Sequence, residues 1–520
     1  MTWKKEVEEL EYRSRLIKEM GGKENIEKHH KRGKLTARER IEKFADKDSF
    51  NEIMPLVGDT SYDGEKIKNI LPKSSVEGFA KLNGNSICVS AGDFTVKGGS
   101  GRVSVNSGIG QEDGIAQQAL TQRIPYIRLL DSAGGSVKNF EKMGRTYLPD
   151  GNAFMWPEVE LLQEVPVASA VLGSVAGLPA VQAPLAHFSV MVRNISQIFP
   201  GGPPVVKAAF GYEISKEELG GDQIHTKLSG CIDNLAENEE DAFEQISKWL
   251  SYLPSSRKEL AKRVEIDDDP NREEESLLSI IPRNRRQTYN IYNIIKSVTD
   301  KNSFFEIAPH YGKSRITGLA RFNGFSVGVI GNNPMVMGGS TDVAGGSKVI
   351  RLIQLCDLFN LPLISFADEP GFLVGLESEK QGIERAGARL MSTVCLSKMP
   401  FCTIVLSKLY GVAGQCHHRP SGMYQRLCWP SSNWGSMHIS GGVSAAFKQE
   451  ILNSPNPEQK RIEIEDRLKQ ISSPFRTAEA TGQNIIDPRK TREKICRFVT
   501  DSQRVPIRSI THVLLALKTF

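Results

Sequence analysis

The chain has 520 residues, 39% hydrophobic and 24% charged, which is the composition of an ordinary globular protein large enough for two or three domains. Its 66 basic and 61 acidic residues leave a net charge of +5, and the basic residues are scattered, so a nucleic-acid partner is not expected. No apolar run approaches the roughly 20 residues of a membrane-spanning helix, and the first ten residues lack the apolar core of a secretory signal. We therefore expect no membrane association and a cytoplasmic protein, or a mitochondrial matrix protein if a transit peptide has been removed.

The first 50 residues are charged and predict helices. Thr36 and Glu39 have the spacing of a capping box, which starts a helix by satisfying its free N–H groups, and Phe44 would pack inward. A second capping box is predicted at Ser215 and Glu218. This helical segment is expected to belong to a first domain spanning residues 1–255.

Residues 70–250 alternate strand-like runs with helical stretches. The runs SICVS, YIRLL and VASAVL are apolar throughout and end in glycine-rich turns, which favours strands buried on both faces in an α/β domain. Residues 241–254 then predict an amphipathic helix with Phe243, Ile246, either Trp249 or Leu250, and Leu253 on one face.

The composition changes after that helix. Residues 255–276 are charged and poor in large apolar side chains, so we expect a linker at 256–287 and a second domain at 288–520. A C-terminal helix is predicted to begin near Pro488, with Ile495 and Phe498 on its buried face.

The second domain repeats the first. Residues 78–100 and 318–340 are identical at 10 of 23 positions without a gap. Two further pairs follow in the same order: residues 124–135 align with 361–372, and residues 166–181 align with 400–415. Three ordered matches indicate one fold used twice, which allows one site to be built from two related halves.

Small residues follow two of the predicted strands. Ser132-Ala133-Gly134-Gly135 comes after YIRLLD, and Tyr410-Gly411-Val412-Ala413-Gly414 comes after TIVLSKL. Such a turn exposes consecutive backbone N–H groups at a helix N-terminus, and small side chains let a ligand oxygen approach them. Each turn is therefore either a candidate oxyanion hole or a tight strand–helix turn without a ligand.

Other motifs carry less information. The eight cysteines contain no C-x-x-C pair and are predicted to be buried thiols in a reducing compartment. No metal site is expected at Cys416-His417-His418, because adjacent residues rarely converge on one ion. The run from Gly98 to Gly101 could cradle a phosphate but is a weak signal alone, and no convincing acid–base pair of side chains can be named.

Several of these segments together resemble the carboxyltransferase (β) subunits of biotin-dependent acyl-CoA carboxylases, such as those for propionyl-CoA and 3-methylcrotonyl-CoA. The resemblance covers nearly the whole chain. It is carried in order by RGKLTARERIEKFADKDSFNEI (32–53), GDFTVKGGSG (92–101), LLDSAGG (129–135), NNPMVMGGS (332–340), CDLFNLPLISFADEPGFLVG (356–375) and YGVAG (410–414).

The resemblance implies a duplicated crotonase-like α/β fold, in which each domain is a spiral of β-β-α units. It also implies a ring of six subunits, with active sites between the first domain of one subunit and the second domain of another. Carboxybiotin carried by a separate protein would donate CO2 to the α-carbon, or a vinylogous carbon, of an acyl-CoA. Biotin itself would take the α-proton, so no side-chain base is needed.

By the same resemblance, the amides of Ala133 and Gly134 would hold one oxyanion and those of Val412 and Ala413 the other. Substrate or cofactor would also contact Gly98, Gly99, Ser100, Gly135, Gly371, Phe372, Gly411, Gly414 and Gln415. Which turn serves the thioester and which serves the biotin ureido group is left open.

The chain departs from the family at three places. Ala133 replaces the first glycine of the family's S-G-G, and Gln415 stands where propionyl-type enzymes usually carry an acidic residue, so the acyl group is not assigned. Residues 417–442 also diverge, which indicates either an altered acyl pocket or neutral drift.

A biotin-bearing A/V-M-K-M tetrapeptide and a biotin carboxylase segment are absent, so a partner carrying both is expected. Two alternatives to carboxylation stay open. One is the reverse reaction, in a biotin-dependent decarboxylase, and the other is a non-catalytic paralogue within a mixed hexamer.

Overall fold

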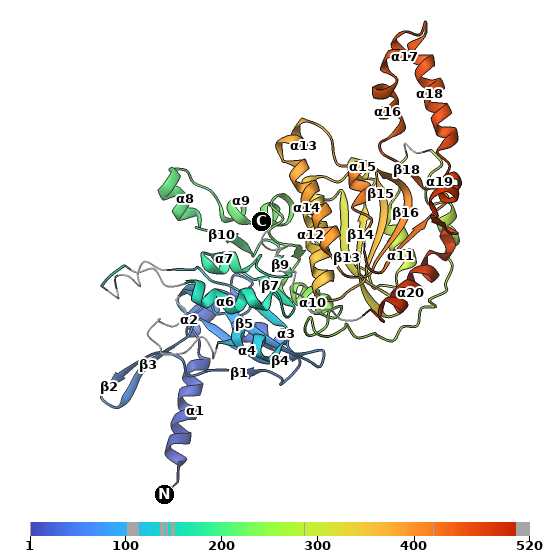
Figure 1. Ribbon diagram of the computed structural model, residues 1–520. Helices are drawn as coiled ribbons and strands as arrows, with labels where there is room; N and C mark the ends of the chain where they lie inside the picture. Colours follow the sequence, from blue (N-terminus) through green and yellow to red (C-terminus); the bar gives the residue numbers. More distant parts are fainter. Residues whose placement is uncertain are drawn as a thin grey trace. The chain divides into compact units, whose positions relative to one another are not determined.

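The computed structural model describes residues 2–100, 114–135, 141, 144–146, 151–284, 287–419 and 421–505. It divides into two compact units, Met1–Arg257 and Lys258–Phe520, which are coloured blue to green and green to red in Figure 1. Each unit is an α/β domain with one large sheet.

The sheet of the first unit has the strand order β1-β4-β5-β6-β7-β9-β11 among the described residues. β4 and β5 form an antiparallel hairpin, whereas β5, β6, β7, β9 and β11 pair in parallel. The strands are β1 (Asn51–Glu52), β4 (Ser75–Leu82), β5 (Asn85–Gly92), β6 (Tyr126–Leu130), β7 (Val167–Val171), β9 (Phe188–Val192) and β11 (Asn234–Ala236). Two small sheets accompany it, from β2 (Gly58–Asp63) with β3 (Lys66–Pro72), and β8 (Ser174–Ala176) with β10 (Gln197–Phe199).

The helices of the first unit confirm several local predictions. Both capping boxes form, at Thr36 and Ser215, and the predicted inward-facing Phe44 is buried. In α10, Phe243, Ile246 and Trp249 of the predicted face are buried, whereas Leu253 lies beyond the end of the helix and is half-buried. The helices are α1 (Lys4–Lys18), α2 (Lys23–His30), α3 (Ala37–Phe44), α4 (Ile115–Gln122), α6 (Gly151–Leu161), α7 (Leu178–Gln182), α8 (Pro203–Phe210), α9 (Lys216–Gly220), a π-helical turn (Gln223–Leu228) and α10 (Glu239–Leu250).

The sheet of the second unit has the matching order β12-β13-β14-β15-β16-β17-β19, and β18 pairs with the far end of β16, within the described residues. In the second unit the single long strand β16 takes the place of β7 and β8. The strands are β12 (Phe305–Glu306), β13 (Arg315–Phe322), β14 (Phe325–Asn332), β15 (Leu363–Glu369), β16 (Phe401–Tyr410), β17 (Tyr424–Cys428), β18 (Asn433–Gly435) and β19 (Asn484–Ile485). The identical strand order confirms that the chain contains one fold twice.

Helices cover both faces of this second sheet. Val327 and Val329 of β14 pack in a core cluster with α11 and α20, whereas a side chain at Gly328 would meet Cys356 of α12, because successive strand residues face opposite sides. The helices are α11 (Ile291–Val298), α12 (Val343–Leu358), α13 (Leu376–Lys380), α14 (Ile383–Leu396), α15 (Gly411–Gln415), α16 (Ile439–Ala446), α17 (Lys448–Leu452), α18 (Pro457–Ile471), α19 (Pro474–Thr481) and α20 (Thr491–Ser502).

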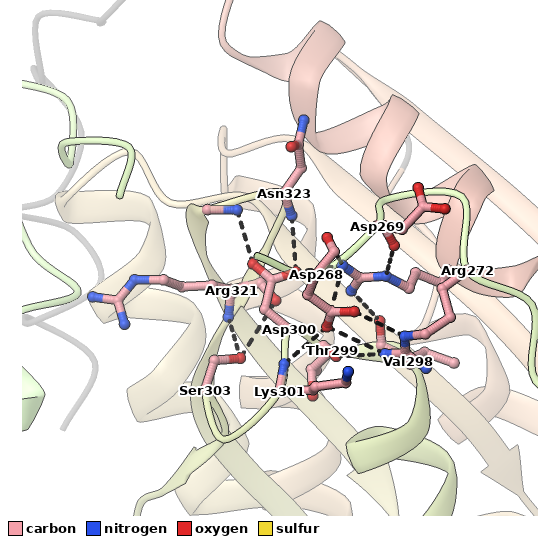
Figure 2. Close-up of polar contacts among 12 residues, drawn as sticks. Asp268, Asp269, Arg272, Val298, Thr299, Asp300, Lys301, Ser303, Arg321 and Asn323 are labelled. Atoms are coloured by element: carbon pink, nitrogen blue, oxygen red, sulfur yellow. Dashed lines mark hydrogen bonds and ion pairs between the residues drawn. The ribbon is translucent and has the colours of Figure 1, made fainter. Parts of the chain in front are cut away.

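The predicted C-terminal helix is α20, and its predicted residues Ile495 and Phe498 are buried. Its Arg492 is also buried and bonds to the start of the second unit at Asp268 and Asp300. Figure 2 shows the polar contacts around Asp268 and Asp300. The guanidinium lies 2.8 Å from a carboxylate oxygen of Asp300 and donates to the backbone carbonyls of Asp268, Asp269 and Val298. The charged segment that the sequence predicted as a linker is thus bonded to the second unit at Asp268.

Two further expectations can be compared with the structure. No helix in the described part of the chain is long and apolar enough to cross a membrane. All eight cysteines are free thiols, but Cys395 is exposed and Cys231 is half-buried, so the prediction of burial was wrong for these two.

Candidate active site

The first predicted turn brings together two glycine segments that lie 35 residues apart in the sequence. The amide of Ala133 donates to the carbonyl of Gly98 at 2.9 Å, and the amide of Gly134 donates to Ser132 Oγ at 3.2 Å. Ser132 Oγ in turn donates to the carbonyl of Gly99 at 2.8 Å. Both predicted oxyanion donors therefore already have acceptors within the protein in this conformation.

Two glycines of this assembly cannot be replaced without a clash. Gly134 has φ +79°, and a Cβ there would lie 2.5 Å from the carbonyl oxygen of Ala176. Gly99 has φ +69°, and its Cβ would lie 2.6 Å from the carbonyl oxygen of Asp131. By contrast, a Cβ at Gly135 would meet nothing within 4 Å. Ser100, the next predicted residue, is buried, whereas Ala133 and Gly135 are exposed.

A buried ionic cluster lies directly behind the first turn. The carboxylate of Asp131, which precedes the turn, is 2.5 Å from Lys34 Nζ, 3.0 Å from Arg40 Nη1 and 3.6 Å from His29 Nε2. Burial, reinforced by the charge of Lys34, lowers the pKa of His29 to about 4, so this histidine is neutral at physiological pH. The cluster fixes the end of β6 and leaves no ionised side chain of its own exposed at the turn.

The second predicted turn is the start of α15. β16 ends at Tyr410, and Gly411 adopts φ +60° as the chain enters the helix. Within the described residues, no acceptor is hydrogen-bonded to the amides of Val412 and Ala413, as expected for the first turn of a helix. Val412 is 53% exposed, whereas Ala413 is 1% exposed, so of the two residues only Val412 lies at the surface.

A second buried ionic cluster lies behind α15. Glu369 is fully buried at the end of β15 and accepts from Arg315 Nη1 at 2.9 Å and Thr341 Oγ1 at 2.5 Å. His417 Nε2 lies 3.5 Å from the same carboxylate. Burial opposes ionisation of Glu369, but its hydrogen bond with His417 and the charge of Arg315 hold the pKa of Glu369 below its ordinary value. Burial also lowers the pKa of His417.

In each unit, one of the two turns contains a proline and therefore lacks one backbone N–H donor. The repeat aligns Ala133 with Pro370 and Ala413 with Pro179. Proline has no N–H group, so the turn after β15 and the start of α7 each lack one donor. Each unit therefore retains one complete amide pair, at Ala133–Gly134 in the first unit and at Val412–Ala413 in the second.

The remaining predicted residues fall into the same two groups. In the second unit Gly371 has φ +130°, and the ring of Phe372 packs against α14 at Gly387. Gly414 is buried against Leu409, whereas Gln415 is exposed. Gly98, Gly99, Ser100 and Gly135 thus belong to the group in the first unit. In the group of the second unit, Gly411, Gly414 and Gln415 lie in α15, whereas Gly371 and Phe372 lie in the separate turn after β15.

The sequence did not predict the roles of Glu369 and His417. His417 had been considered only with its neighbours as a metal cluster, but its side chain is bonded to Ser365 and Glu369. Nor, in the described part of the chain, does any group of three His, Cys, Asp or Glu residues have the geometry to hold a metal ion. Two acidic residues at the end of a buried strand, as in LISFADE, are the signal that could have identified Glu369.

Known proteins are similar to this chain in sequence and in fold. A family model described as the carboxyl transferase domain matches residues 28–508. The methylmalonyl-CoA decarboxylase subunit alpha of Veillonella parvula is 32% identical over 503 residues, covering 95% of each chain. The mitochondrial propionyl-CoA carboxylase beta chain of Homo sapiens is 35% identical over 499 residues, covering 94% of this chain and 89% of its own.

Solved structures give the same result. A transcarboxylase 12S crystal structure, described as a hexamer with methylmalonyl-coenzyme A and methylmalonic acid bound, superposes with a TM-score of 0.86 and 29% identity over 98% of each chain. The fold is therefore the duplicated crotonase-like α/β fold that the sequence predicted. The chain belongs to the carboxyl transferase family, as the resemblance had indicated, and is an enzyme of that family.

Proposed function

We propose that this protein is the carboxyltransferase subunit of a biotin-dependent acyl-CoA carboxylase. It would move a carboxyl group from carboxybiotin on a partner protein to the α-carbon, or a vinylogous carbon, of an acyl-CoA. The observation that carries the proposal is the presence of one complete amide pair in each unit, at Ala133–Gly134 and at Val412–Ala413. The reaction needs two such pairs, because negative charge develops on the thioester oxygen and on the ureido oxygen of biotin.

The two amide pairs differ in whether a ligand oxygen must displace an existing hydrogen-bond acceptor. The amides of Val412 and Ala413 have no described hydrogen-bond acceptor that a ligand oxygen would have to displace. At the first turn a ligand oxygen would replace Ser132 Oγ, whose 3.2 Å contact with the Gly134 amide is the longer of the two bonds there. Removal of one oxyanion-hole donor typically costs a factor of about 100 to 1,000 in rate, so both pairs are worth retaining.

The buried acids and histidines do not supply the base. Asp131 and Glu369 are fully buried and paired with Lys34 or Arg315, and His417 is only 1% exposed. A group in these positions cannot reach the α-proton of a bound thioester. Biotin, when bound, would supply the carboxyl group and accept that proton, so the chain's own residues orient the reactants and stabilise charge.

The proposal includes partners. The acyl-CoA would bind beside these turns, and a separate subunit would carry biotin and biotin carboxylase. A hexamer of this chain is proposed by analogy with the transcarboxylase 12S assembly. The exposed Gln415, in the last position of α15, is proposed to contact the acyl group and to influence which acyl-CoA is accepted.

A second candidate is supported by one comparison. The Veillonella parvula relative is named as a methylmalonyl-CoA decarboxylase subunit, so the same site could operate in the reverse direction. Both candidates require carboxyl transfer between biotin and an acyl-CoA, and both are tested by one half-reaction.

The test uses purified full-length protein, free biotin, and a panel of malonyl-CoA, methylmalonyl-CoA and longer carboxyacyl-CoAs. We expect loss of the substrate carboxylate, followed by mass spectrometry, only when biotin is present. The relative rates would rank the acyl groups. No turnover with any substrate, together with no binding of CoA thioesters by calorimetry, would contradict the proposal and favour a non-catalytic paralogue.

A further inference from the structure

One buried carboxylate joins several loops at the end of the second unit's sheet. Besides Arg315 and Thr341, Glu369 Oε2 accepts from Asn332 Nδ2 at 2.8 Å, while Oε1 accepts from the amide of Gly371 at 3.0 Å. These donors come from the starts or ends of β13 and β14, from the segment after Met337–Gly339, and from the turn after β15. A single side chain thus fixes the relative positions of the segments that surround the turn.

His417 connects this carboxylate to α15. It lies two residues beyond the helix, and its amide bonds to the carbonyl of Gly414 at 3.3 Å. Its side chain lies between Glu369, at 3.5 Å, and Ser365 Oγ, at 2.7 Å. The carbonyl of His417 accepts from Thr403 Oγ1 at 2.6 Å. Both the backbone and the ring of His417 are therefore held, and the end of α15 is held with them.

The first unit builds the same sheet without this ionic set. The repeat places Ser132 at the position of Glu369, Ser75 at that of Arg315 and Ala183 at that of His417. Ser132 reproduces only one contact, because its Oγ accepts from Gly134 as Glu369 accepts from Gly371. The first unit buries its own carboxylate one residue earlier, at Asp131, so the shared sheet does not by itself require an ionic set at the position of Glu369.

We propose that Glu369 and His417 are positioning residues for carboxyl transfer, which hold α15 so that the amides of Val412 and Ala413 stay aligned on one oxyanion. This inference rests on the proposed function. Neither side chain can touch the reactants, since Glu369 is 0% and His417 1% exposed. Their effect is instead on geometry, where a displacement of about 1 Å can cost a factor of about 100 in rate.

The test compares His417→Leu with His417→Gln in the full-length protein, using the biotin-dependent decarboxylation described above. Leucine keeps much of the volume but removes both side-chain bonds, whereas the glutamine amide can still donate towards Glu369. We expect the leucine variant to lower kcat about tenfold while KM for the acyl-CoA changes less than twofold. The glutamine variant should stay within about threefold of the wild type.

His418→Leu is the matched control. His418 is exposed and stacks on Tyr424 with ring centroids 4.6 Å apart, so the same substitution one residue later should leave kcat unchanged. Equal losses in the two leucine variants, or a loss confined to KM, would overturn the proposal.

Hydrogen exchange of residues 411–417 gives a readout that does not depend on activity. We expect His417→Leu to speed exchange in this segment by about tenfold while residues 126–135 of the first unit stay at the wild-type rate. Unchanged exchange in residues 411–417 would overturn the positioning role even if the wild-type protein proved inactive. Inactivity of the wild type would separately overturn the proposed function.

Discussion

The two units carry the same pair of turns on the same strands, but proline removes an amide donor from a different turn in each. In the first unit Ala133 keeps its N–H group after β6, whereas Pro179 lacks one at the start of α7. In the second unit the pattern is reversed, with Pro370 after β15 and Ala413 in α15. The first unit has thus kept both amides of the turn after β6, and the second unit has kept both amides at the start of α15.

The difference also extends to the groups behind the turns. In the first unit a neutral hydroxyl, Ser132, accepts from the glycine amide, and in the second unit the ionised Glu369 does so. Each unit nevertheless places a buried histidine at 3.5–3.6 Å from a buried carboxylate, as His29 beside Asp131 and His417 beside Glu369. The duplication has kept the framework and changed the chemistry that supports each turn.

The largest expected effect follows from making α15 resemble α7. Ala413→Pro removes one donor of the Val412–Ala413 amide pair. Because proline is tolerated in the first turn of a helix, the fold should survive. We expect the rate of biotin-dependent decarboxylation to fall about 100-fold to 1,000-fold. Pro179→Ala, which gives the first unit the donor it lacks, should leave the rate within twofold. An active Ala413→Pro protein would show that this pair does not stabilise the reaction.

A smaller effect is expected at the first turn from Gly134→Ala. The added methyl group would lie 2.5 Å from the Ala176 carbonyl, and alanine disfavours the positive φ of +79°. We expect activity to fall about tenfold to 100-fold and the free energy of unfolding to fall by about 1–3 kcal/mol. Gly211→Ala is the control, because Gly211 has the same φ of +79° with nothing within 4 Å. Equal losses of activity in both variants would exclude a specific role for the first turn.

The smallest expected effect concerns pH and the His29 cluster. Because the pKa of His29 is lowered to about 4, the unfolded chain binds a proton between pH 6.5 and 4 that the folded chain does not. The stability of the first unit should therefore decrease as the pH falls through this range, and His29→Gln should reduce the decrease by about 2 kcal/mol between pH 7 and pH 5. Hydrogen exchange of β6 measures this, and an equal pH dependence in both proteins would contradict it.

Much of the fold could be predicted because its signals are local. The Asn-Gly turns at 83–84 and 323–324 have positive φ at both residues, and the amides of each are held by one aspartate, Asp46 or Asp300. Such turns accept few residue types, so the repeat remained visible in the sequence. Capping boxes likewise depend on residues three positions apart, and both predicted ones form.

The support of the site could not be predicted in the same way. Glu369 collects donors that lie between 2 and 54 residues away in the sequence, and no local pattern records that convergence. Nor does the motif S-A-G-G reveal that the amide of Ala133 is bonded to Gly98. Local spacing predicts turns and caps, whereas buried ionic contacts depend on which loops the topology brings together.

The contacts of the buried Arg492 determine where the chain can be divided into its two copies. Arg492 closes the second unit on itself, because a helix near residue 500 holds backbone carbonyls near residue 268. A fragment that begins at Lys258 keeps every partner of this guanidinium, whereas one that begins after Leu278 leaves it to Asp300 and Val298 alone. The natural cutting point between the two copies therefore lies before the charged segment, although composition would have placed it within or after that segment.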